Sequence, residues 1–140
     1  MAKSTRQYVF DGMELLPIAL APFVEKRLES ALTGHWEVKV SEKLKGLKVD
    51  GKGKFSWDQS ALLNAMNLFW MDAFKTALGR ADRAIVNELV EVRNKLSHNE
   101  TFTYDDAERA LDSMRRLMEA ISAGETAEQL GKMRDTILRT

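Results

Sequence analysis

Three polar residues that could perform chemistry lie close together in the second half of the chain: Arg93, Asn94 and His98. A histidine exchanges protons near neutral pH, and a guanidinium can donate two parallel hydrogen bonds to phosphate oxygens. Five residues of unbroken helix turn a side chain by about 140°, so Arg93 and His98 cannot share a site within one straight helix. The sequence suggests one way for them to converge, because Arg93 lies on the last turns of a helix and His98 at or just past its end.

A purely structural role is the competing interpretation of the same residues. A histidine at the C-terminus of a helix is favoured by the helix dipole. Arg93 would then form an ion pair with Glu88, Glu100 or another carboxylate. Residue types and spacing leave both interpretations open.

The segments around this cluster predict two helices that meet at a short elbow. Apolar residues recur at helical spacing in the first of them, from Gly79 to His98, and define its buried face: Ile85, Leu89, Val92 and Leu96. Thr103–Asp106 resembles a capping box that starts the second helix, and Gly124 is expected to stop it. Thr126–Gln129 predicts the start of a last helix.

The first third of the chain predicts one long helix followed by a connector. Residues Met1–Gln7 are expected to form a loose start, with the helix beginning at Asp11 and ending at Gly34. Pro17 is expected near the first turn, where proline is tolerated, and Pro22 should kink or restart the helix.

Residues 35–55 are rich in lysine and glycine and predict a connector, which is either a solvated linker or a basic lip beside a nucleic-acid groove. Within it, Trp36–Val40 alternates and suggests a short extended piece. Ser56–Gln59 predicts a capping box that opens a helix reaching Ala77. That helix is apolar around most of its circumference, so it is either central in a bundle or covered by a second subunit.

Composition sets further bounds. The 140 residues suit a single domain, 1–140, and the 21 acidic and 21 basic residues balance, which gives no support to general nucleic-acid or membrane affinity. There is no cysteine, and the two histidines lack ligand spacing, so we expect no metal and no cofactor. The longest apolar run is too short to span a bilayer, which predicts a soluble cytoplasmic protein.

The predicted fold is all-α: an up-and-down four-helix bundle with an additional C-terminal helix.

These residues resemble a known family, the HEPN domains, which are helical bundles. The stretch Arg93-Asn94-Lys95-Leu96-Ser97-His98 matches the family signature of an arginine, a polar residue and a histidine. Four other blocks look like one branch of the family: Ala21–Glu25, Trp57–Leu63, Leu78–Ala81 and Asp105–Asp112. That branch resembles the HEPN domain of a eukaryotic RNA-quality-control endoribonuclease, and its prokaryotic members often lie at the N-terminus of anti-phage ATPases and helicases.

The resemblance implies metal-independent RNA cleavage by a homodimer of toxin or defence type. His98 would act as general acid and base, Arg93 would stabilise the charged phosphorane, and Asn94 would orient the histidine or a phosphate oxygen. Lys52, Lys54 and Lys95 are the candidate RNA-binding lysines. The two-fold axis of a dimer would bring Arg93 and His98 together from opposite subunits.

The resemblance also supports an alternative function without catalysis. Many domains of this family keep the bundle and serve only in binding or assembly. In that case the chain would dimerise, or recruit RNA or partners, for an attached or associated ATPase or helicase, and it would be the N-terminal part of a longer protein.

Overall fold

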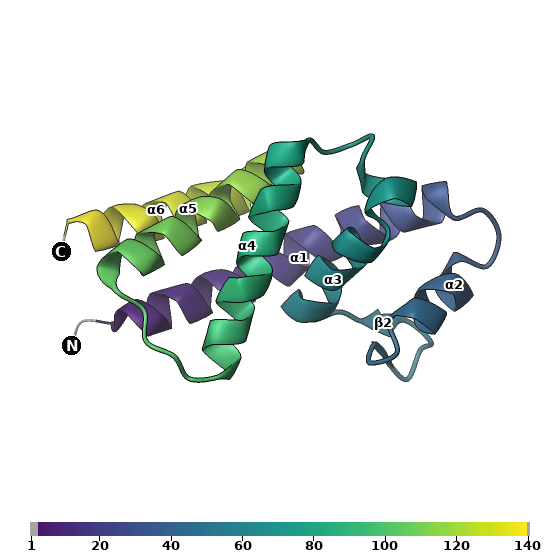
Figure 1. Ribbon diagram of the computed structural model, residues 1–140, viewed down its shortest axis with the longest axis horizontal. Coiled ribbons are helices and arrows are strands. Elements are labelled where there is room, and N and C mark those ends of the chain that lie inside the picture. The colour runs from purple at the N-terminus through teal and green to yellow at the C-terminus, as the bar shows by residue number, and fades with distance from the viewer. Residues whose placement is uncertain (1–2, 140) are drawn as a thin grey trace.

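The computed structural model describes residues 3–139, which form helices and one small hairpin (Figure 1). The helical elements are α1 (Thr5–Ala31), α2 (Trp36–Lys43), α3 (Gln59–Leu68), the short π-helix η1 (Trp70–Phe74), α4 (Arg80–Ser97), α5 (Tyr104–Ala120) and α6 (Gly124–Leu138). Strands β1 (Lys48–Val49) and β2 (Phe55–Ser56) pair antiparallel. The predicted all-α class is confirmed.

Helix α1 runs through the middle of the molecule, and α3, η1, α5 and α6 all pack against it. Its apolar residues recur every three or four positions and are almost fully buried: Val9, Met13, Leu16, Leu20, Val24 and Leu28. In Figure 1, α1, α5 and α6 follow the long axis of the molecule, and α4 crosses them steeply. The core therefore lies between this layer and the α3–α4 pair.

Gly12 allows α1 to approach α5 closely. A Cβ atom built on Gly12 would lie 2.8 Å from Leu111 Cδ2 and 2.9 Å from Met114 Sδ. Both distances are shorter than a normal van der Waals contact. The glycine is therefore a packing requirement of the α1–α5 contact.

The expectations for the N-terminal helix were partly wrong. Of the predicted loose start, residues 1–2 lie outside the described part of the chain, but α1 already begins at Thr5, because the Ser4 hydroxyl accepts the Gln7 N–H at 3.0 Å. Pro17 is therefore in the helix interior, and Pro22 does not restart the helix. The helix ends at Ala31, short of the expected Gly34.

A buried side chain compensates for Pro17. Proline has no N–H, so the carbonyl of Met13, four residues earlier, loses its helical partner. The Gln59 side-chain amide donates to that carbonyl at 3.0 Å, and only 8% of Gln59 is exposed. This hydrogen bond joins the first residue of α3 to the middle of α1.

Three further local predictions were wrong. Trp36–Val40 is helical rather than extended, because Trp36 and Val40 at helical spacing both pack inward. The cap of α3 is Asp58 rather than Ser56, since Asp58 Oδ1 accepts the Ala61 N–H at 2.7 Å. Gly124 begins α6 instead of stopping α5, so the last helix starts before the predicted Thr126–Gln129 cap. The α5 end is closed by Ser122 in the left-handed region (φ 63°).

The apolar segment after Asp58 is central within one protomer. It divides into α3 and η1. Leu62, Met66, Phe69 and Phe74 are at most 2% exposed, whereas Leu68 and Met71 are 48% and 67% exposed. The burial of the first four side chains needs no second subunit. Among the residues that the structure describes, no helix has the length and apolar content to cross a membrane.

Leu111→Ala should lower the free energy of unfolding by about 2–5 kcal/mol, because Leu111 is fully buried against α1 and its loss leaves a cavity. Leu138→Ala is the matched control. Leu138 is 58% exposed, so the change should stay within about 0.5 kcal/mol. Urea denaturation followed by circular dichroism measures both, and equal effects would contradict this core.

Candidate active site

The three candidate catalytic residues lie on the last turns of α4, which is one unbroken helix through Ser97. Arg93 is half-buried, whereas Asn94 and His98 are exposed. His98 is the residue at which the helix ends, as expected, but its φ of −96° leaves it close to helical geometry. The helix end therefore does not swing His98 round toward Arg93, and the two side chains of one protomer point in different directions.

The backbone after His98 is tightly fixed. Asn99 adopts the left-handed conformation (φ 55°), its N–H donates to the Leu96 carbonyl at 3.3 Å, and the Glu100 N–H donates to the Lys95 carbonyl at 3.0 Å. This pair of bonds is the Schellman motif, and asparagine tolerates the left-handed position better than most residues. His98 is therefore presented to solvent from a rigid turn.

Arg6, on the first turn of α1, binds the turn that follows α4. Its Nη2 donates to the Leu96 carbonyl at 2.7 Å and to Asn99 Oδ1 at 3.1 Å. The neighbouring Thr5 hydroxyl donates to the Phe102 carbonyl at 2.6 Å. Sequence reasoning missed Arg6, because it lies 90 residues from Leu96 in a segment expected to be loose and carries no motif.

A small pocket of about 140 Å³ opens beside Arg93. It lies between α1, the start of α3 and the end of α4, and it is lined by Arg6, Phe10, Met13, Glu14, Gln59, Arg93 and Leu96. The hydrogen bond that Gln59 makes to Met13 therefore also builds one wall of the space next to the candidate catalytic arginine.

Arg93 has no carboxylate partner within residues 3–139. Its Nη1 donates to the hydroxyl of Ser97, one turn further along α4. Glu88, a partner expected under the structural interpretation, instead accepts from Arg109 Nε at 2.5 Å and from the Ser113 hydroxyl at 3.2 Å. The charge of Arg93 is therefore not neutralised by an ion pair.

Lys95 is engaged inside the elbow. Its Nζ lies 3.6 Å from Asp106 Oδ2 and 4.7 Å from the centre of the Phe102 ring. The backbone N–H and the hydroxyl of Thr103, together with the charge of Lys95, hold the pKa of Asp106 below its usual value. This ion pair ties the end of α4 to the start of α5.

The structure does not place the other two candidate RNA-binding lysines with Lys95. Lys52 and Lys54 lie in and next to the turn of the β1–β2 hairpin, where their backbone N–H groups donate to Asp50 Oδ1 at 2.8 and 3.0 Å. The hairpin lies beside α2, away from the C-terminal end of α4 (Figure 1). No three histidine or acidic side chains of the described chain gather in an arrangement that could hold a metal ion.

Comparison with known proteins identifies the family. The family model described as Swt1-like HEPN matches residues 11–122. The chain belongs to the Swt1-like HEPN family. No curated protein and no solved structure matches it. Membership in this HEPN family points to a nuclease or an RNA-related module. Arg93, Asn94 and His98 lie inside the matched HEPN region, whereas Arg6 precedes it.

Arg6→Ala should loosen the end of α4 in this HEPN domain, because the Leu96 carbonyl and Asn99 side chain lose a charged donor. We expect amide hydrogen exchange at Asn99 and Glu100 to accelerate about fivefold, as for the loss of about 1 kcal/mol of local stability. Lys3→Ala, which removes an exposed ion pair to Asp11 and a cation–π contact 5.3 Å from the centre of the Tyr8 ring, is the control and should leave both amides unchanged. Unchanged exchange in Arg6→Ala would show that the Arg6 hydrogen bonds are not needed.

Proposed function

We propose that this HEPN domain is a metal-independent endoribonuclease that acts as a homodimer. The observation that carries the proposal is the state of Arg93: a guanidinium without a carboxylate partner, half-buried beside an open pocket, five residues before an exposed histidine on a rigid elbow. Arg115, by contrast, is neutralised by ion pairs with Asp112 and Glu119. The toxin or defence setting rests on the family resemblance alone.

The proposed reaction is transfer of the phosphodiester to the neighbouring ribose 2′-oxygen. One His98 removes the 2′-OH proton as the 2′-oxygen bonds to phosphorus, and the other His98 of the dimer protonates the 5′-oxygen as its bond to phosphorus breaks. Arg93 donates to the phosphorane oxygens, and Asn94 orients the histidine or a phosphate oxygen. The products are a 2′,3′-cyclic phosphate and a free 5′-OH.

The geometry of α4 supports the dimer. Arg93 and His98 diverge within one protomer, so a site that uses both needs a second copy of the helix end. Phe10, which is 42% exposed, lies on the rim of the pocket beside Arg93 and would be covered by that copy. A two-fold interface of this kind would place the two elbows opposite each other.

RNA cleavage should persist in EDTA, because the proposed acid, base and charge-stabilising groups are all side chains. It should leave a 2′,3′-cyclic phosphate, and a substrate with hydrogen in place of one 2′-OH should not be cut at that position. Arg93→Ala and His98→Ala should each abolish cleavage, and Asn94→Ala should weaken it less. Gel analysis and mass spectrometry of the products measure all of these.

His35→Ala and Arg116→Ala are the matched controls for the cleavage experiment, since they change the same residue types outside the site. Both should retain activity. His98→Ala should change the free energy of unfolding by no more than about 0.5 kcal/mol, because the imidazole is exposed and makes no hydrogen bond within residues 3–139. Full activity of Arg93→Ala and His98→Ala would refute the assignment, and inactivity on every RNA would favour the non-catalytic dimerisation or recruiting module.

Phe10→Glu should convert the proposed dimer into monomers, because it introduces two charges at the two-fold contact beside the Arg93 pockets. Val49→Glu makes the same change on the hairpin, where Val49 is 55% exposed, and should leave the dimer intact. Sedimentation velocity at tens of micromolar, about the range in which weak dimers dissociate, measures both. A monomeric parent protein at that concentration would contradict the dimer.

A further inference from the structure

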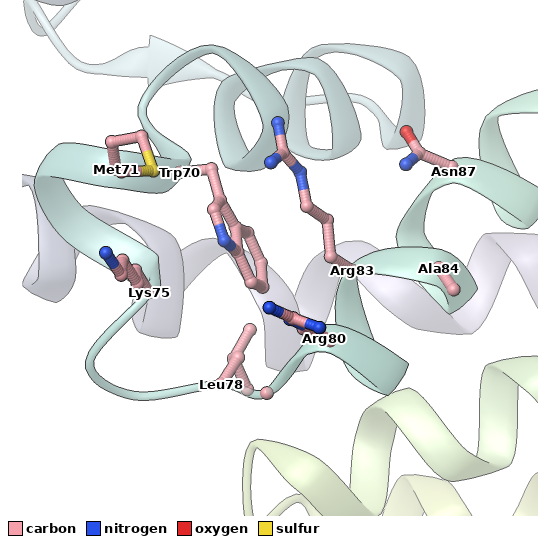
Figure 2. Close-up of a pocket in the computed structure, with 9 residues that line it drawn as sticks. Trp70, Met71, Lys75, Leu78, Arg80, Arg83, Ala84 and Asn87 are labelled. Carbon is pink, nitrogen blue, oxygen red and sulfur yellow. The ribbon is translucent and has the colours of Figure 1, made fainter.

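A second, larger pocket lies at the other end of α4. It has a volume of about 540 Å³ and is formed where η1 and the turn after it meet the first turns of α4. Figure 2 shows Lys75, Arg80 and Arg83 arranged around the indole of Trp70, with Met71 on the η1 side. The wide turn of η1, in which the Lys75 N–H donates to the Trp70 carbonyl at 2.8 Å, brings Trp70 and Lys75 to this wall.

The charge of this pocket is one-sided. Three of its lining residues are cationic and none is acidic, although the whole chain is neutral. Within residues 3–139 none of Lys75, Arg80 and Arg83 forms an ion pair. The nearby Asp82, in the first turn of α4, does not line the pocket, and its Oδ2 accepts the Gly79 N–H at 2.8 Å. An unbalanced group of cations of this kind favours an anionic ligand.

Arg83 is held in place while one of its donors is unused. Its guanidinium carbon lies 5.3 Å from the centre of the Trp70 ring, an arrangement that restricts the side chain. Its Nε atom is buried and has no hydrogen-bond partner in the described chain. A buried donor without an acceptor is costly, so the guanidinium of Arg83 favours an acceptor that approaches it from the pocket.

The start of α4 strengthens the preference for an anion. Gly79 precedes the helix and has no side chain to cap its first amide groups. The positive end of the helix dipole therefore faces the same space as the three cations. The helix dipole therefore supports an anionic ligand in addition to the three cations and the unused donor of Arg83.

The register of α4 connects the pocket to the candidate active site. Arg83 and Asn94 are eleven residues apart, so they lie within about 20° of the same face and about 16 Å apart along the axis. Asn87, tied to Asn67 at 2.8 Å, lies between them on that face. A stacked strand rises about 3.4 Å per nucleotide, so five nucleotides bridge this distance.

We infer that the pocket between η1 and α4 binds backbone phosphates of the RNA strand about five nucleotides from the scissile bond. The inference rests on the proposed endoribonuclease function and adds a second anchor for the same substrate. Lys75 and Arg80 contact one or two phosphates at the mouth of the pocket, and the guanidinium of Arg83 donates to a phosphate oxygen deeper inside. The affinity of the domain for long RNA then depends on a site remote from His98.

The test measures binding without cleavage. The full chain with His98→Ala is titrated with a labelled single-stranded RNA of about twelve nucleotides at several salt concentrations, and anisotropy gives the affinity. Adding Lys75→Gln and Arg80→Gln should weaken binding about tenfold. The slope of log affinity against log salt concentration should become less steep by about 1.4, the value for two lost single-strand phosphate contacts. Both residues are exposed, so the fold should persist.

The control removes the same two charges from α5 and α6 with Arg116→Gln and Lys132→Gln, whose side chains are 61% and 76% exposed. It should leave affinity and salt dependence unchanged. Arg83→Gln, checked for folding by circular dichroism, should weaken binding further than either mouth residue alone. Equal effects of the two double variants would overturn the inference, as would a parent that binds no RNA.

Two further measurements distinguish an RNA site from a site for an acidic protein, and RNA binding from RNA cleavage. A glutamate-rich peptide of the same length and charge should bind much more weakly than RNA, and equal losses on peptide and RNA would assign the pocket to an acidic protein and overturn the inference. An RNA that binds through Lys75 and Arg80 but is never cleaved by the wild-type chain would refute the endoribonuclease and leave the phosphate site standing.

Discussion

Burial of the apolar face of α1 is the constraint on which the rest of the structure depends. Each fully buried side chain of this face contributes about 1.5–3 kcal/mol relative to exposure, and the face extends from Val9 to Leu28. Helices α3, α5 and α6 all pack on it, and Gly12 sets the distance to α5. Arg6 lies on the first turn of the same helix, so the element that organises the core also holds the end of α4 in place. The candidate active site is therefore rigid through its connection to the core.

The two ends of α4 differ in how their backbone groups are hydrogen-bonded and in which side chains lie beside them. At its C-terminus the last carbonyls are satisfied by the turn through Asn99 and by Arg6, which leaves His98 exposed on a fixed backbone. At its N-terminus Asp82 accepts the Gly79 N–H, and the three cations of the neighbouring pocket form no ion pair within residues 3–139. One straight helix thus carries a group able to exchange protons at one end and an excess of positive charge at the other. Such a helix suits a long polyanionic substrate better than a small one.

Much of this could be predicted from local pattern. The apolar spacing predicted Leu89, Val92 and Leu96 on the buried face of α4, although Val86 is buried there and Ile85 only partly. The capping box at Thr103 predicted the start of α5, and the spacing of Arg93 and His98 excluded a shared site in one straight helix. What failed depends on contacts between distant segments. The capping of the Met13 carbonyl by Gln59 makes Pro17 acceptable inside a helix, and no local rule contains that partner. Arg6 was missed for the same reason, since it stabilises the end of α4 by a hydrogen bond to a carbonyl 90 residues away.

The π-helix η1 has a consequence for evolution. A π turn contains one residue more than an α turn, so it arises or disappears through a single-codon insertion or deletion between Asp58 and Gly79. A relative without that codon would keep the Arg93–His98 elbow but would rotate Trp70 and Lys75 out of the pocket wall. The length of this segment, readable from gene sequences alone, would therefore distinguish a relative with the cationic pocket from a relative with only the elbow.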